Sequence, residues 1–176
     1  FPPGFRWEHE FFGTNGRLTE MQSAIGRVQL RRIPEWHARR LQIANTIWLT
    51  AMELPGLRVP RLPPHIEHAA YKCYVFVSPE ELAPGWDRDR VMAEINALGV
   101  PCYSGSCPEV YLEKAFESTG YQPPKRLPNA KELGETSLMF LCHPTLTNDE
   151  VAKTCDVLET VMQRAVTRQK LDGSYG

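Results

Sequence analysis

A single proline interrupts a long helical pattern near the start of the chain, and this interruption most limits what the chain can fold into. Before it, apolar residues recur at three- and four-residue steps, at Leu18, Met21, Ile25 and Val28. This spacing predicts an α-helix with one apolar stripe. Pro34 lacks a backbone N–H and crowds the preceding turn, so the helix should end or bend at Ile33.

A second helix is expected after the bend, from about Pro34 to Leu54. Its predicted buried face consists of Ile43, Ile47, Ala51 and Leu54. Thr19 and Gln22 have the spacing of a capping box, in which a hydroxyl and an amide satisfy the free N–H groups at a helix start. The chain therefore opens with two helices that meet at a bend.

Strands and helices are intermixed after residue 54. The proline-rich segment 55–64 is expected to be an extended connector. The predicted strands are 71–77, 100–103 and 137–142, and the last is apolar enough to be central. The predicted helices are 87–98, a short helix that ends at Gly134, and a helix that begins with the capping box of Thr147 and Glu150.

These elements predict an α/β (α+β) fold in which helices flank a small antiparallel or mixed sheet and long N-terminal helices lead away from it. We expect three parts: linking helices in 1–54, a small C-terminal α/β domain in 55–168, and a disordered tail in 169–176.

Composition excludes several classes of protein. The 20 basic and 21 acidic residues nearly balance, which argues against a nucleic-acid binder. The basic cluster at Arg31, Arg32, Arg39 and Arg40 is broken by Pro34, Glu35 and Trp36, and it is expected to be a solvated helix face. No run approaches the roughly 20 apolar residues of a membrane-spanning helix.

The start of the chain has neither an initiator Met nor a signal-peptide pattern. We therefore expect this sequence to be part of a longer protein.

The five cysteines are scattered, and their spacing matches no common zinc pattern, so no metal site is predicted. Cys73 and Cys155 are expected to be small core residues in a reducing compartment, which indicates a cytoplasmic protein.

Without a family comparison, the residues alone predict no self-sufficient active site. The chain has no glycine-rich phosphate loop followed by lysine, no Gly-x-Ser-x-Gly elbow, and no histidine pair spaced for metal on a helix. The five dispersed histidines are expected to have surface or structural roles.

Residues 13–30 change this interpretation, because they resemble a stretch of the DegT/StrS family of pyridoxal-phosphate (PLP) sugar aminotransferases. The family pattern is Gly-x-Asn-x-Arg-Met-x-Glu-x-Gln-Ala-Ala-x-Gly-x-x-Gln-Leu. This chain matches it with Leu18 in place of Met and Ser23 in place of the first Ala. Residues 71–76 resemble the family's aromatic strand, and 138–144 with 146–147 resemble its late strand-turn-helix signature. The resemblance covers roughly residues 5–165 and corresponds to the family's C-terminal portion.

The resemblance implies a role for Asn15 in binding the phosphate of PLP held by the partner subunit of a homodimer. An amide on a turn before a helix can donate to a phosphate oxygen without titrating. The alternative is that Asn15 only adopts a left-handed turn beside Gly16. Arg17 is expected either to bind a phosphate of PLP or of the nucleotide-sugar substrate, or to pair with Glu20. Capping and dimer packing are the roles expected of Thr19, Glu20 and Gln22.

Residues 101–107 stand where many family members have a loop that faces the sugar. Tyr103, Ser104 and Ser106 are the substrate-binding candidates, although the family's histidine is missing from this loop. His143 either places a polar group at a strand end or caps the following turn.

The catalytic lysine of the family precedes the Asn motif, and none of the six lysines here does so. The resemblance thus implies a C-terminal domain whose PLP-binding large domain is absent, so the fragment alone is expected to be inactive and to bind PLP weakly or not at all. The complete enzyme is expected to move an amino group from an amino acid, with glutamate as the expected donor, to a nucleotide-linked keto-sugar for lipopolysaccharide, other polysaccharide or related amino-sugar biosynthesis. Two alternatives stay open: a PLP-dependent sugar dehydratase of this family, with histidine for the lysine, and a non-catalytic dimerisation or ligand-sensing module.

Overall fold

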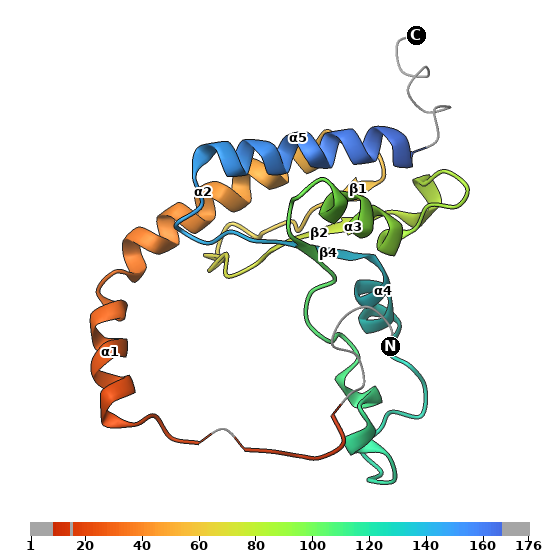
Figure 1. The fold of residues 1–176 in the computed structure, drawn as a ribbon. Coiled ribbons are helices and arrows are strands. Elements are labelled where there is room, and N and C mark those ends of the chain that lie inside the picture. The colour runs from red at the N-terminus through yellow and green to blue at the C-terminus, as the bar shows by residue number, and fades with distance from the viewer. Residues whose placement is uncertain (1–8, 15, 167–176) are drawn as a thin grey trace.

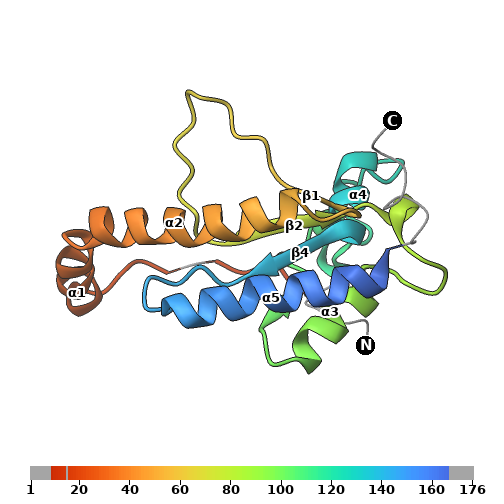
Figure 2. The same ribbon diagram turned by 90° about the horizontal axis from the view of Figure 1, so that it is seen from above.

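The computed structural model describes residues 9–14 and 16–166, which form a four-stranded sheet with helices packed on one face (Figures 1 and 2). The α-helices are α1 Glu20–Leu30, α2 Ile33–Met52, α3 Arg88–Ala97, α4 Pro128–Thr136 and α5 Asn148–Ala165. The strands are β1 Leu57–Arg58, β2 Cys73–Val77, β3 Cys102–Tyr103 and β4 Ser137–Phe140, and the short 3-10 turns are η1 Pro79–Glu81, η2 Val110–Leu112 and η3 Lys114–Phe116.

The sheet has the strand order β1-β2-β4-β3, and every neighbouring pair is antiparallel. Cys73 lies opposite Phe140 in the β2–β4 pair, and Cys102 lies opposite Phe140 on its other side. β4 is thus an internal strand, as its apolar sequence predicts. The α/β fold class expected from the sequence is confirmed.

The core lies between the sheet and three helices. Alternate residues of β2 are buried, at Cys73, Val75 and Val77, and they face α2, α3 and α5. The predicted buried face of α2 is confirmed at Ile43, Ile47 and Ala51, whereas Leu54 is half-buried at the edge of this core. Cys73 and Cys155 are both buried, in agreement with their predicted core roles.

The predicted bend is present, since α1 ends at Leu30 and α2 begins at Ile33. Both predicted capping boxes form, at Thr19 with Gln22 and at Thr147 with Glu150. α1 leads away from the sheet and has no buried residue (Figure 1). The predicted apolar stripe is 53–76% exposed, at Leu18 just before α1 and at Met21, Ile25 and Val28 within it.

Two local predictions are wrong. The expected connector 55–64 contains β1, because Leu57 and Arg58 pair with Val77 and Phe76 of β2. α4 continues two residues beyond Gly134 instead of ending there. Gly134 is needed for close packing rather than for helix termination, because a Cβ at this position would lie 2.4 Å from Cγ of Pro108.

A buried arginine joins α3 to the start of β4. Arg88 is only 5% exposed, and its Nη1 donates to the carbonyl oxygens of Gly134 at 3.2 Å and Ser137 at 2.8 Å. Its Nε donates to the Asp89 carboxylate at 2.7 Å. These bonds satisfy a charge that would otherwise be costly to bury.

The predicted tail 169–176 lies outside the described residues, as does Asn15.

Candidate functional site

Three of the sequence-predicted substrate residues meet in one cleft beside β3 and β4. This cleft, called the loop cleft below, has a volume of about 510 Å³. It is lined by Lys72, Met92, Cys102, Tyr103, Ser104, Gly105, Ser106, Met139 and Leu141. Tyr103 is half-exposed at the end of β3, and Ser106 is exposed on the following loop. A phenol, two hydroxyls and an ammonium group therefore face one cavity, which suits a polyhydroxylated ligand.

Hydrogen bonds from the sheet hold the loop in this position. Ser137 Oγ donates to the Ser104 carbonyl at 2.7 Å, and Lys72 Nζ donates to Ser106 Oγ at 3.2 Å. The backbone N–H of Ser106 donates to the Tyr74 hydroxyl at 3.4 Å. Lys72 and Met139 were missed as site residues. The signal for Lys72 is its place at the edge of the aromatic strand, directly before β2.

Gly105 lets the loop turn tightly over Tyr74. Its φ is +88°, and a Cβ there would lie 2.5 Å from Cε1 of Tyr74. We predict that Gly105→Ala lowers the free energy of unfolding by about 2 kcal/mol, from the left-handed backbone and the contact together. Gly120→Ala is the matched control, because Gly120 has φ +77° but nothing within 4 Å of its Cβ position. Urea denaturation should show a loss of about 1 kcal/mol in the control. Equal losses would mean that Tyr74 does not constrain the loop.

The other predicted site residues are not brought to the loop cleft. His143 is exposed, and its Nδ1 lies 2.8 Å from Thr145 Oγ1, as expected of a side chain that caps the following turn. Arg17 is exposed just before α1, and no ion pair joins it to Glu20 in the described part of the chain. Asn15 is not among the described residues. The binding roles of all three residues stay predictions.

Residues 109–126, called the excursion below, follow the loop cleft. Two buried carboxylates hold this segment in place. Glu109 is 3% exposed and forms an ion pair with Arg126, while the Tyr111 hydroxyl donates to its Oε1 at 2.6 Å. Glu113 is 4% exposed and accepts from the backbone N–H of His9 at 2.8 Å. These contacts fix the position of residues 109–126 next to the loop 101–107.

Residues 9–14 are tied to this excursion (Figure 1). Besides the bond to Glu113, the His9 carbonyl accepts from the N–H of Ala115 at 2.9 Å. Phe12 packs edge-on against Phe116 with 5.0 Å between ring centroids. The segment that leads into the Gly-x-Asn motif is therefore anchored close to the excursion that follows the loop cleft.

The Glu109–Arg126 contact should make stability depend on pH. The hydrogen bonds from the Arg126 guanidinium hold the pKa of the Glu109 carboxyl below its ordinary value. A lowered native pKa stabilises the fold above the unfolded pKa, and this stabilisation is lost as pH falls through the native pKa. We predict that Glu109→Gln lowers the urea midpoint at pH 7 and that the difference from the wild type shrinks below about pH 4.

Glu117→Gln is the control for this pH effect, because Glu117 is exposed in the same excursion. It should leave the pH dependence unchanged. A Glu109→Gln difference that is constant from about pH 3 to pH 7 would contradict the proposed charge effect.

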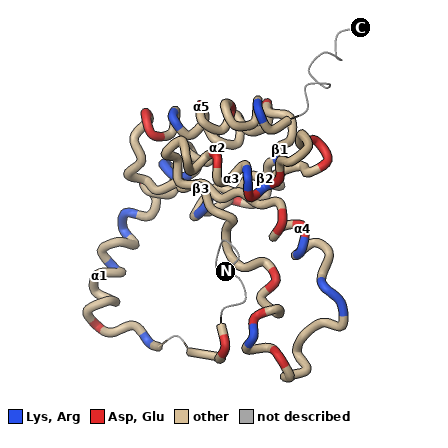
Figure 3. The backbone as a smooth tube through the Cα atoms, turned by 45° about the vertical axis from the view of Figure 1, so that its right-hand side comes forward, with Lys and Arg blue, Asp and Glu red and all other residues tan. Residues whose placement is uncertain are grey.

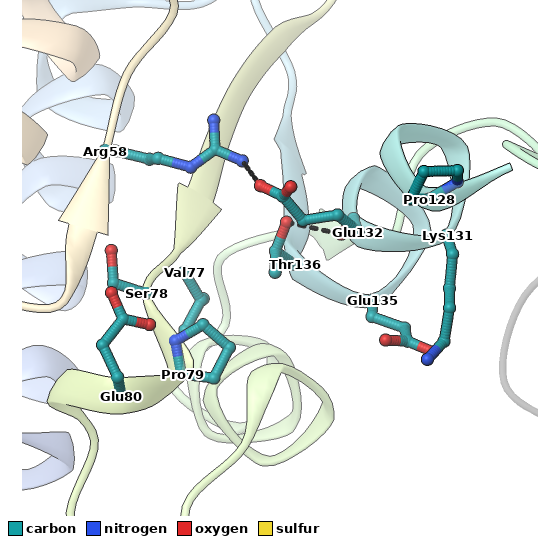
Figure 4. A pocket seen from close by; sticks show the side chains of 10 residues that line it. All are labelled: Arg58, Val77, Ser78, Pro79, Glu80, Pro128, Lys131, Glu132, Glu135 and Thr136. Atoms are coloured by element: carbon teal, nitrogen blue, oxygen red, sulfur yellow. Dashed lines mark hydrogen bonds and ion pairs between the residues drawn. The ribbon is translucent and has the colours of Figure 1, made fainter.

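A second cleft is lined by charged residues that pair with one another (Figure 4). It has a volume of about 450 Å³ and lies between β1, the end of β2 and α4. Arg58 Nη2 is 2.6 Å from Glu132 Oε1, and Lys131 Nζ is 3.8 Å from Glu135 Oε1. Its cations are already matched by carboxylates, so this cleft is a weaker candidate than the loop cleft.

The described residues contain no group of three or more His, Cys, Asp or Glu side chains arranged for a metal ion. Burial raises the pKa of the Cys102 thiol to about 12, so Cys102 is a neutral lining residue rather than a nucleophile.

The described residues also do not fit PLP as a complete site. A PLP aminotransferase needs a lysine in an enclosed pocket, where the cofactor attaches. Lys72 is the lysine at the loop cleft, and its Nζ donates a hydrogen bond to Ser106 Oγ. Lys114 and Lys131 pair with carboxylates, and Lys153 Nζ donates to the Gly99 carbonyl at 3.3 Å. Lys125 is exposed in the loop before α4.

No helix within the described residues has the length and apolarity needed to cross a membrane.

Similar proteins include solved and curated aminotransferases. An aminotransferase from Psychrobacter cryohalolentis is 52% identical, with a TM-score of 0.79 over 93% of this chain and 43% of that one. The erythromycin biosynthesis sensory transduction protein EryC1 of Saccharopolyspora erythraea is 30% identical over 82% of this chain and 37% of its own length. The dTDP-3-amino-3,4,6-trideoxy-alpha-D-glucose transaminase of Streptomyces venezuelae is 26% identical over 90% of this chain and 40% of its own length.

This chain thus spans about two fifths of the length of these relatives. The sequence pattern of the DegT/DnrJ/EryC1/StrS aminotransferase family matches residues 3–159. The chain belongs to this family.

Proposed function

We propose that this chain is the C-terminal portion of a PLP-dependent aminotransferase that acts on a nucleotide-linked keto-sugar. The observation that carries the proposal is the family match over residues 3–159, in a chain that spans only about two fifths of its relatives. The Streptomyces venezuelae relative is named for a dTDP-sugar transaminase activity. The amino donor in our proposal is an amino acid, with glutamate as the expected one.

The chain's own residues would shape the sugar site in this proposal. Tyr103, Ser104 and Ser106 would bind sugar hydroxyls in the loop cleft, and Lys72 beside them would favour an anionic or strongly polar group. His143 would bind substrate only if its contact with Thr145 opened. Asn15 and Arg17 would bind phosphate. The cofactor, which provides the site for amino-group transfer, and its lysine would come from the rest of the enzyme.

The exposed apolar stripe of α1 supports the proposed homodimer. An 11-residue helix is marginal in water unless its apolar face is covered. Leu18, Met21, Ile25 and Val28 are all more than half exposed along one side of this helix and the turn before it, which is typical of an interaction surface. A partner subunit packed on α1 would cover them close to the Asn15 motif. Free buried thiols agree with our further proposal of a cytoplasmic enzyme in amino-sugar or lipopolysaccharide biosynthesis.

A chimera can test this proposal while the natural substrate is still unidentified. The aligned portion of the Psychrobacter cryohalolentis aminotransferase, to which this chain is 52% identical, would be replaced by this chain. We expect the chimera to bind PLP, seen by its visible absorbance, and to convert a panel of nucleotide-linked keto-sugars to amines with glutamate, seen by mass spectrometry. The remaining Psychrobacter portion alone is the control.

The product distinguishes the alternatives. A dehydrated sugar instead of an amine from the natural full-length protein would favour the dehydratase, whose Escherichia coli example, GDP-4-keto-6-deoxy-D-mannose-3-dehydratase, shares this fold with a TM-score of 0.64 and 22% identity. A folded chimera that binds no PLP and transfers no amine would contradict the proposed role of this chain.

A further inference from the structure

A cleft at the bend between α1 and α2 has features that the proposed sugar site does not use. This elbow cleft has a volume of about 590 Å³. It is lined by Gln29, Ile33, Trp36, His37, Arg40, Glu67, Ala69 and Tyr71. The residues come from the end of α1, the first turns of α2, and the segment that precedes β2. The cleft therefore depends on the bend at Pro34.

Each of two aromatic rings in the elbow cleft lies close to an arginine, and of these two arginines Arg40 lines the cleft whereas Arg32 does not. The Arg40 guanidinium carbon lies 5.8 Å from the centroid of Tyr71, and that of Arg32 lies 6.0 Å from the centroid of Trp36. Arg40 Nη1 also donates to the Tyr71 carbonyl at 3.3 Å, which fixes its position. A guanidinium has five N–H donors, so further donors remain for a ligand. Flat apolar surfaces next to planar cations suit an aromatic ring that bears phosphate.

The two helices that form the elbow cleft carry more basic than acidic residues. Six arginines and two glutamates fall between residues 17 and 40, and the basic residues line α1 and the start of α2 (Figure 3). The one carboxylate that lines the cleft, Glu67, lies 3.5 Å from Nδ1 of His37. Arg40 is thus placed in an aromatic cleft, whereas the sequence predicts only a solvated helix face for it.

The elbow cleft and the loop cleft are neighbours. A third cleft, of about 450 Å³, shares Glu67, Ala69 and Tyr71 with the elbow cleft. It shares Lys72 and Ser106 with the loop cleft. The segment 67–72 thus contributes to all three clefts, and a ligand longer than one cleft could contact both ends.

We propose that the elbow cleft binds the nucleoside diphosphate portion of the nucleotide-sugar. The base would lie against Trp36 and Tyr71, and the diphosphate would bind Arg40, with Arg32 beside the Trp36 ring as a second cation. This inference rests on the proposed function for its choice of ligand, because the sugar end would then lie toward the loop cleft. The elbow cleft itself is argued from its own aromatic and cationic residues.

Titration of the full 176-residue chain with dTDP, followed by NMR of backbone and indole N–H groups, tests the inference. We expect saturable shifts at Trp36 and its neighbours. Tyr71→Leu should weaken dTDP binding at least about fivefold through the loss of base stacking, and Arg40→Gln should weaken it by at least about the same factor through the loss of a charged donor to phosphate. Tyr71 is 73% exposed, so its replacement should not unfold the chain.

A second arginine–tryptophan pair provides the matched control. Arg90 lies 4.2 Å from the ring centroid of Trp86, outside the elbow cleft. Arg90→Gln and Trp86→Phe should leave dTDP binding unchanged. Thymidine and inorganic pyrophosphate, titrated separately, should each bind more weakly than dTDP.

The inference is overturned if the wild type shows no saturable dTDP binding, if Tyr71→Leu and Arg40→Gln bind as the wild type does, or if pyrophosphate alone binds as tightly as dTDP. Failure of this kind would leave the aminotransferase proposal standing, because the chimera tests amine transfer independently. A chimera without amine transfer, in turn, would leave dTDP binding by this chain unaffected.

Discussion

Replacement of Arg88 by methionine should lower the free energy of unfolding by about 3 kcal/mol, the largest stability effect expected of a single polar residue here. Methionine is unbranched like the aliphatic part of arginine, but it ends before the guanidinium and has no N–H donor. The carbonyl oxygens of Gly134 and Ser137 would then be buried without the bonds that Arg88 Nη1 donates at 3.2 and 2.8 Å. Urea denaturation at constant m-value measures the loss.

Arg90→Met is the matched control, because Arg90 lies two residues later in the same helix turn but is exposed. It should cost less than about 1 kcal/mol. Arg88→Lys should fall between the two, since an ammonium keeps the charge but cannot reproduce the planar fork. Equal destabilisation by Arg88→Met and Arg90→Met would mean that the buried bonds of Arg88 contribute no more to stability than the surface contacts of Arg90.

The importance of Arg88 could not be predicted from the sequence, and the reason is physical. A charged residue in the first turn of a helix is usually solvated, and nothing local indicates that two carbonyl oxygens some 46–49 residues away require donors. β1 was missed for the same reason, because its two residues become a strand only by pairing with β2. Gly134 was misread because its contact, Pro108, is distant in the sequence.

Features that depend on neighbours in the sequence were predicted well. Both capping boxes join residues three apart, and the bend at Pro34 follows from the chemistry of one ring. The core face of α2 follows from helical spacing.

The residues of the candidate sites also differ in whether their meeting depends on sequence neighbours or on distant contacts. Tyr103, Ser104 and Ser106 share a cleft because they are close together in the sequence, whereas Lys72 joins them through a contact across 34 residues. The elbow cleft needs Arg40 and Tyr71 together, and these are 31 residues apart. The aromatic and cationic residues were visible in the sequence, but their meeting depends on how segment 67–71 folds back onto α2.

Replacement of Asn15 by alanine in the Psychrobacter chimera should weaken PLP binding about 50-fold. A hydrogen bond to a charged group contributes about 1.5–3 kcal/mol, which corresponds to roughly 10- to 150-fold in affinity. The prediction rests on the family motif, since Asn15 lies outside the described residues. Titration of the apo-chimera with PLP, followed by visible absorbance, gives the dissociation constant, and Asn45→Ala, on an exposed face of α2, is the control.

Asn15→Gly separates phosphate binding from turn formation. Glycine adopts the left-handed turn at least as readily as asparagine but has no side-chain amide. If Asn15 binds the phosphate, Asn15→Gly should lose PLP affinity as severely as Asn15→Ala does. If Asn15 only forms the turn before α1, Asn15→Gly should bind PLP as the unmodified chimera does, and the phosphate role is then wrong. In the proposed homodimer, where a partner subunit supplies the pocket, the affinity loss should also be visible when Asn15→Ala is present in one subunit of a tagged heterodimer, at only one of its two sites.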